Sequence, residues 1–373
     1  MSSTRQHLAH EEKYKKILTL MPEYVKDYVL FMENNERSPS TLYNYLKDFY
    51  HFFTWLKREI VPEVDDIKDI PEKVLEDLPL DAAMAYFNQL SNEKIELSSH
   101  EKKKRERNSV NRKKSALRSL FKYLTTQYEK NNGDPLFHRN VMLKVPVVKM
   151  KESLNARSTK LADSIFHDDK DIDFLQYIKN GYALELSERQ AKYFARDRER
   201  DFALLSLFLG SGIRVNELAE LRIRDLNFED CNISVIRKGD KRDVVKVFPD
   251  IMSDINEYLN IRNERYGGTY AEHEYLFLNK RKNTPSPLTV RAIQDLVRKY
   301  TKAFNNGKRS MSPHKLRHTY ATNLMDATGD LSLVMEQLGH TSETTALLYV
   351  HTSQEKAKKA AEALQARRNR LKE

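Results

Sequence analysis

Cations and hydrogen-bond donors recur through the second half of the chain and end in a tyrosine: Arg214, Lys238, His314, Arg317, His340 and Tyr349. A phosphate under attack gathers negative charge on its non-bridging oxygens, and a guanidinium group holds two such oxygens at once. His314 and Arg317 are three residues apart, so a helix that begins at Pro313 presents both on one face, near the positive end of its dipole. The set indicates phosphoryl transfer, with two arginines in place of a metal ion.

Two members of this set could move a proton or attack. Lys238 lies in a polar turn between two β-branched runs, where a mobile ammonium could protonate a departing oxygen, although most hairpin lysines only keep turns soluble. Tyr349 could be a nucleophile, but a phenol of pKa about 10 needs nearby cations or a proton acceptor. The alternative for Tyr349 is a buried core residue, since the chain has 19 tyrosines.

Other site chemistries find little support. His314 and His318 have the spacing of zinc ligands, but the cations Lys315 and Arg317 lie between them and no glutamate does. The chain has no phosphate-binding glycine-lysine loop, no dinucleotide fingerprint and no nucleophile elbow. The aspartates between Asp163 and Asp173 lack the spacing of a calcium loop. We therefore expect no metal and no cofactor.

The segments SGIRVNELAEL, HKLRHTYAT and LGHTSETTALLY occur in this order, and SPSTLYNYLKDFYHFF precedes them in the first half. Together they resemble the three boxes and the N-terminal helical module of the tyrosine recombinase (phage integrase) family. The resemblance implies that Arg214 and Arg317 bind the scissile phosphate, His314 and His340 assist, Lys238 is the leaving-group acid and Tyr349 attacks. It also makes Glu217 a supporting acid, which could otherwise be an ordinary exposed helix residue. Tyr320 is a less favoured nucleophile because it lies inside the second box.

The same resemblance implies an activity and partners. Such enzymes cut and rejoin double-stranded DNA at a specific site through a 3′-phosphotyrosine link and a Holliday junction, as four protomers on two duplexes. The compact layout looks like the Xer group, and within it a XerS-like single recombinase that resolves chromosome dimers at cell division, with a septal DNA translocase as a possible activator. The alternatives are an integrase or transposase of a mobile element, and a DNA-binding relative that has lost catalysis.

Composition agrees with a DNA-binding protein. Lys and Arg number 64 against 54 Asp and Glu in 373 residues, and the resulting charge of +10 favours an anionic partner. No apolar run approaches the roughly 20 residues of a membrane span, and the N-terminus lacks the apolar segment of a secretory signal. The single Cys231 cannot form an intrachain disulfide. We expect a cytoplasmic protein without membrane insertion.

The elements that must position these residues are mostly helical. Ser38 and Pro39 predict the start of a helix whose apolar residues recur at steps of three and four, and the runs 232–236 and 244–248 predict a hairpin around Lys238. The expected fold class is mainly α with a small β-hairpin or sheet. The resemblance implies a helical, SAM-like core-binding domain and a mixed α+β catalytic domain that form a two-domain DNA clamp. The expected division is an extension (1–19), a helical domain (20–130), a linker (131–172), a catalytic domain (173–354) and a helical tail (355–373). In relatives such a tail docks on the neighbouring protomer; the alternatives are a solvated helix and another DNA contact.

The densest positive stretch lies between the second and third predicted helices and runs into the third. Its candidates for contact with the DNA backbone are Lys102, Lys103, Lys104, Arg105, Arg107, Arg112, Lys113 and Lys114. Phosphate contacts of this kind would supply affinity with a strong salt dependence, but no choice of sequence. The alternative is a solvated loop and helix face, because charge runs are often only surface.

Overall fold

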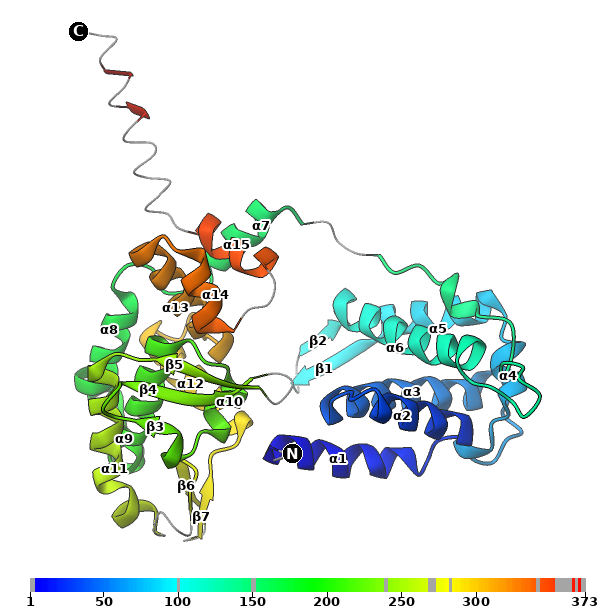
Figure 1. Cartoon of the computed structure of the whole chain (residues 1–373), viewed down its shortest axis with the longest axis horizontal. Helices are drawn as coiled ribbons and strands as arrows, with labels where there is room; N and C mark the ends of the chain where they lie inside the picture. The colour runs from blue at the N-terminus through cyan, green and yellow to red at the C-terminus, as the bar shows by residue number, and fades with distance from the viewer. Residues whose placement is uncertain are drawn as a thin grey trace. The chain divides into compact units, whose positions relative to one another are not determined.

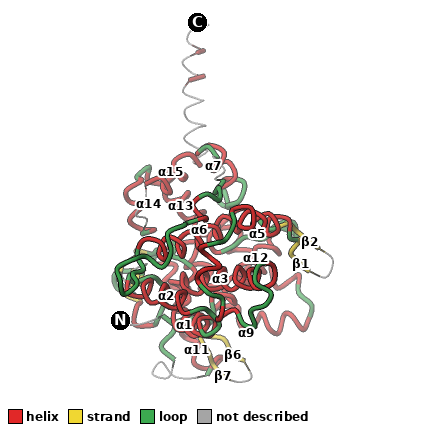
Figure 2. The backbone as a smooth tube through the Cα atoms, turned by 90° about the vertical axis from the view of Figure 1, so that its right-hand side faces the viewer, coloured by secondary structure: helices red, strands yellow, loops and turns green. Residues whose placement is uncertain are grey.

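The computed structural model divides the chain into two compact units, Met1–Met150 and Lys151–Glu373 (Figure 1). It describes residues 4–98, 101–148, 152–237, 241–267, 273–281, 284–339 and 343–352, with 364–365 and 368–369. Helices make up most of both units and the strands form three small antiparallel sheets, as Figure 2 shows by colour. The mainly helical fold class with a small sheet is thereby confirmed. Within the described ranges, no helix is long and apolar enough to cross a membrane.

The first unit is a helical bundle with one short hairpin. Its elements are α1 (Arg5–Leu18), α2 (Glu23–Asn34), α3 (Pro39–Glu59), α4 (Glu72–Glu76), α5 (Leu80–Asn92), β1 (Lys94–Ser98), β2 (Glu101–Lys104) and α6 (Arg107–Thr126).

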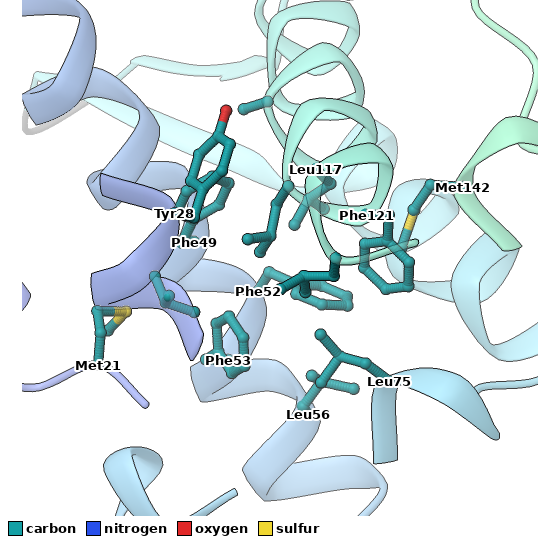
Figure 3. Close-up of a cluster of buried hydrophobic side chains, with 14 of the residues drawn as sticks. Met21, Tyr28, Phe49, Phe52, Phe53, Leu56, Leu75, Leu117, Phe121 and Met142 are labelled. Carbon is teal, nitrogen blue, oxygen red and sulfur yellow. The ribbon is translucent and has the colours of Figure 1, made fainter. Parts of the chain in front are cut away.

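Helix α3 lies at the centre of this bundle and begins where the sequence predicts. The Ser38 hydroxyl accepts a hydrogen bond from the backbone N–H of Thr41 at 3.3 Å, and Pro39 occupies the first turn. Its apolar residues are buried with those of α2 and α6, as the close-up of Phe49, Phe52 and Phe53 shows (Figure 3). The apolar face of α3 therefore organises the core of the first unit.

Residues expected to form an N-terminal extension form part of this core. Helix α1 packs along α3, and its Tyr14 is buried and donates a hydrogen bond to Glu33 at 2.6 Å. Most of α1 is polar, so its sequence carries little of the apolar periodicity that predicts a packed helix.

The division between the units falls inside the stretch predicted as a linker. On its N-terminal side, Phe137, Val141 and Met142 are buried in the core of the first unit. On its C-terminal side, helix α7 (Leu154–Ala162) packs against α15 (Glu343–Thr352). Residues 149–151, between these two regions, lie outside the described residues.

The second unit places helices around a three-stranded sheet. Its further elements are α8 (Lys170–Gln176), α9 (Glu188–Ser211), α10 (Val215–Glu220), β3 (Leu226–Asn227), β4 (Asn232–Ile236), β5 (Arg242–Lys246), α11 (Pro249–Tyr266), β6 (Leu278–Arg281), β7 (Thr284–Pro287), α12 (Val290–Phe304), α13 (Pro313–Thr328) and α14 (Leu331–Leu338).

The predicted hairpin is present, with one strand displaced. β4 covers the predicted residues, but β5 begins two residues before the expected start because Arg242 pairs with Ile236 and extends the ladder toward the turn. Phe248, expected in the strand, is instead the N-cap of α11. The predicted turn around Lys238 belongs to the segment between these two paired strands, and residues 238–240 lie outside the described residues.

Helices α13, α14 and α15 lie side by side within the second unit (Figure 1). Gly329 and Gly339 end α13 and α14 in the left-handed conformation, with φ values of 67° and 58°. These ends turn the chain so that the last turn of α14 faces α10 and the base of the β4–β5 hairpin, through the contacts described next.

Candidate active site

Three arginines converge on the C-terminal end of α14. Arg214 donates to the carbonyl of Gly339 at 3.3 Å, and Arg317 donates to the carbonyl of Leu338 at 2.6 Å. Arg237 donates to the same Leu338 carbonyl at 3.0 Å and to Gln337 at 2.7 Å. The last carbonyls of a helix have no partner within it and form the negative end of its dipole, so cations are stabilised there.

A buried carboxylate joins two of these arginines. Glu217 accepts from the Arg214 side chain at 2.7 Å and from the Arg214 backbone N–H at 2.8 Å, which also caps the start of α10. Oε2, the oxygen that accepts the backbone N–H, also accepts from Arg237 at 3.3 Å. Glu217 is therefore a buried residue that orients two guanidinium groups, and the exposed alternative does not describe it.

Two glycines permit the close approach of these groups. Gly212 has a φ of 61°, and a Cβ there would lie 2.4 Å from the Tyr320 ring. A Cβ on Gly339 would lie 2.7 Å from Nε of Arg237. The Gly212 carbonyl accepts from Arg317 at 2.6 Å, so both helix ends that carry these glycines contribute acceptors to the arginine cluster. Any side chain at either position would displace the groups around it.

Tyr349 lies on α15, buried beside the cluster. His318 of α13 lies 2.9 Å from its hydroxyl through Nδ1. Burial raises the pKa of Tyr349 to about 12, while Arg317 and Arg214 act in the opposite direction. The phenol is thus neutral near pH 7 and has a histidine nitrogen within hydrogen-bond distance. Tyr320, the less favoured tyrosine, packs against Gly212 with the apolar residues of α14.

The positive charge of the cluster also acts on α13. Burial, and next the charge of Arg214, lower the pKa of Arg317 to about 10. The pKa of His314 is lowered by partial burial and then by Arg317, Lys315 and Arg214. The rings of His314 and His318 are 4.2 Å apart, edge to face. The charges of Arg214 and Arg317 contribute to these shifts, and the same charges would stabilise a bound anion.

The structure therefore brings four of the seven predicted site residues into one cluster, with His314 at its edge: Arg214, Glu217, Arg317 and Tyr349. Lys238 and His340 lie outside the described residues, each next in sequence to a cluster residue, Arg237 and Gly339. Sequence reasoning missed Arg237 and the contact of His318 with Tyr349. The spacing of His318 four residues after His314 was a signal, but the sequence analysis weighed it only as a zinc-ligand pattern, which it disfavoured.

The basic stretch of the first unit is largely engaged in protein contacts. Asp48 of α3, a buried aspartate, binds Arg112 at 2.6 Å and Lys113 at 3.0 Å. Arg105 pairs with Glu93 at 2.6 Å, and Lys114 donates to the carbonyl of Pro146 at 2.8 Å.

The remaining DNA-binding candidates of this stretch are exposed or have side chains outside the described part of the structure. Lys104 and Arg107 are exposed on β2 and α6. The side chains of Lys102 and Lys103 lie outside the described part of the structure. Arg112, although paired, keeps much of its side chain at the surface.

The chain is similar to proteins of one kind along nearly its whole length. The phage integrase family matches residues 184–356. Tyrosine recombinase XerS of Streptococcus pneumoniae (strain P1031) is 38% identical over 353 residues, which cover 95% of this chain and 98% of the relative. XerS of Streptococcus thermophilus (strain CNRZ 1066) is 38% identical over 354 residues, with the same shares. The XerH site-specific recombinase bound to palindromic difH substrate shares the fold, with a TM-score of 0.60 at 23% identity over 89% of this chain and 82% of that one.

Proposed function

Because this chain belongs to the phage integrase family of tyrosine recombinases, which break and rejoin DNA, we propose that it resolves chromosome dimers by recombination at a specific site. Support for this finer role comes from the XerS relatives, whose length this chain matches almost completely. The observation that carries the chemistry is a tyrosine hydroxyl 2.9 Å from a histidine, beside arginines gathered at one helix end.

In the proposed reaction Tyr349 attacks the scissile phosphorus. The Tyr349 Oη–P bond forms, the P–O5′ bond breaks, and the product is a 3′-phosphotyrosine with a free 5′-hydroxyl. Arg214 and Arg317 hold the non-bridging oxygens as charge develops on them. No nucleotide hydrolysis is required, because the energy of the phosphodiester is kept in the phosphotyrosine link.

Two protons move in this step. His318 accepts the phenol proton through Nδ1, which requires that its other ring nitrogen carry the hydrogen. Lys238 gives a proton to the departing O5′, and His314 and His340 assist by hydrogen bonding to the phosphate. The raised pKa of Tyr349 makes a proton acceptor necessary, because few phenols are ionised at pH 7.

The proposed assembly is a homotetramer on two duplexes. A 5′-hydroxyl from one strand attacks the phosphotyrosine of its partner and produces a Holliday junction. The basic stretch of the first unit contacts the DNA backbone, a septal DNA translocase activates the complex, and the reaction takes place in the cytoplasm. These parts of the proposal rest on the family, and the cations of the first unit supply only non-specific affinity.

Covalent trapping tests the chemistry and the target together. Purified protein is mixed with fragmented genomic DNA in excess EDTA and denatured, and the protein-linked DNA is sequenced and the modified residue mapped. We expect a 3′-link on Tyr349 at one recurring sequence near the replication terminus, and no adduct with Tyr349→Phe although DNA binding persists.

Other outcomes would correct the proposal. A recurring sequence at the ends of a mobile element would indicate an integrase or transposase. An adduct that persists in Tyr349→Phe would place the nucleophile on another residue. Tight, salt-sensitive binding without any adduct, even with a septal translocase added, would indicate a DNA-binding relative without catalysis.

A further inference from the structure

Arg237 belongs to this cluster, and neither phosphate binding nor proton transfer has been assigned to it. Its guanidinium group contacts four partners on three segments: Asp243 of β5 at 2.9 Å, Glu217 of α10 at 3.3 Å, and the carbonyls of Leu338 and Gln337 at 3.0 and 2.7 Å. The side chain is buried, so these contacts replace water rather than compete with it.

The backbone of Arg237 also fixes the base of a turn. Its N–H donates to the carbonyl of Lys241 at 2.7 Å, directly after the last pair of the β4–β5 ladder. Lys238 is the next residue in the sequence. The Arg237 side chain therefore ties the point at which this turn leaves the sheet to the end of α14.

A second tie runs through Gly339. The absence of a side chain there leaves room for the Arg237 guanidinium, whose Nε would otherwise lie 2.7 Å from a Cβ. His340 follows Gly339 directly. One buried arginine thus directly precedes Lys238 and lies against Gly339, the residue that precedes His340, and it shares Glu217 with Arg214.

We propose that Arg237 is a positioning residue, which fixes the base of the Lys238 turn against the end of α14 so that Lys238 delivers its proton to the departing O5′. This inference rests on the proposed function. Arginine suits the role because its planar fork offers several donors in fixed directions, whereas a lysine ammonium would leave some of the four acceptors unsatisfied.

The experiment separates proton delivery from folding. Single-turnover cleavage is measured on two nicked duplexes that carry the trapped site, one with the normal 5′ oxygen and one with a 5′-bridging sulfur at the scissile bond. A sulfur leaving group departs without a proton, so a defect in proton delivery disappears on that substrate. The quantity of interest is the ratio of the sulfur rate to the oxygen rate.

We expect this ratio to rise at least 10-fold over the wild type in Arg237→Met, and by about 100-fold or more in Lys238→Ala, which removes the acid itself. Arg237→Lys keeps the positive charge but not the planar guanidinium group, so its ratio is also expected to rise. This variant replaces Arg237→Met in the experiment if the methionine variant fails to fold. Arg262→Met is the matched control: Arg262 is another buried arginine of this unit, which donates to the carbonyls of His273, Tyr275 and Leu276. Arg262→Met is expected to lower the stability of the protein and to leave the ratio of the sulfur rate to the oxygen rate unchanged.

Two results overturn the inference, and they are distinguishable. Arg237 variants that cleave both substrates equally slowly, while Lys238→Ala is rescued by sulfur, would make Arg237 a purely structural residue like Arg262. If sulfur does not rescue Lys238→Ala either, the leaving-group assignment in the proposed function is wrong and the inference falls with it.

Discussion

The two units use the same arrangement of charges for different ends. In the first, Asp48 is 1% exposed and holds Lys113, 7% exposed, and Arg112, 45% exposed. In the second, Glu217 is 4% exposed and holds Arg237, 8% exposed, and Arg214, 39% exposed. Each buried carboxylate thus binds one buried and one half-exposed cation.

The difference lies in the buried cation. Lys113 forms an ion pair with Asp48 and so joins two helices, α3 and α6, whereas Arg237 reaches four acceptors on three segments next to the reacting groups. In the first unit the arrangement presents one cation on a stable surface. In the second it fixes relative positions inside a site, and geometry rather than charge is then what a substitution destroys.

The largest effect should come from Arg317, which has no counterpart in the first unit. Arg317→Ala is expected to slow single-turnover cleavage by about 100-fold or more, because it removes a preorganised donor to the phosphate oxygens. Lys113→Met, the comparison variant, should cleave at the wild-type rate when DNA is saturating. Near-normal cleavage by Arg317→Ala would remove Arg317 from the phosphate site.

The two carboxylates should separate stability from catalysis. Asp48→Asn leaves Lys113 buried without its charge partner and should cost about 3 kcal/mol of unfolding free energy, with the cleavage rate at saturating DNA unchanged. Glu217→Gln should lower both the urea midpoint and the cleavage rate. If Glu217→Gln is destabilised but cleaves at the wild-type rate, Glu217 is a structural residue like Asp48. The two carboxylates would then not differ in function.

A smaller effect is expected at the exposed cation of the first unit. Arg112→Ala should weaken DNA binding a few-fold and reduce the slope of log K against log salt by about 1, the value for one lost phosphate contact. Arg58→Ala is the control, since Arg58 is an exposed arginine of α3 paired with Glu59, outside the basic stretch. An unchanged slope for Arg112→Ala would leave this arginine as a structural partner of Asp48.

The smallest expected effect is a loss of folding stability at low pH. Burial, then Lys113 and Arg105, lower the pKa of His51 in the first unit, and the pKa of His314 in the second is also lowered. The unfolded chain then binds protons more readily, so stability falls as the pH drops below about 6.5, by well under the roughly 1.4 kcal/mol per pH unit of one full proton. His51→Gln should flatten the pH dependence of the first unit's melting temperature between pH 7 and 5. An equally steep decline in that variant would assign the effect to other groups.

Local signals in the sequence were sufficient for much of the fold. Ser38 and Pro39 predicted the start of α3, and Pro313 predicted the start of α13, because these signals depend on residues at the helix end itself. The site motifs likewise identified Arg214, Arg317 and Tyr349 as members of one cluster. The roles of these residues remain predictions, since geometry alone measures no reaction.

What could not be predicted depends on partners far away in the chain. Arg237 reads as part of a polar turn, and only the fold brings it to Gln337, 100 residues later. Arg112 and Lys113 read as free surface charge because Asp48 precedes them by more than 60 residues. The packing of helix α1 could not be predicted for the same reason, since the surface on which it packs belongs to α3.

The carbonyls at the end of α14 stabilise the arginines through partial charges that do not change with pH. A carboxylate beside an arginine loses its charge in acid and disappears with one substitution, but a backbone oxygen does neither. The contacts between the arginines and α14 therefore depend on the length of this helix and not on the side chains that α14 carries. Deleting one residue between Leu331 and Leu338 would rotate the helix end by about 100° and turn all three acceptors away together.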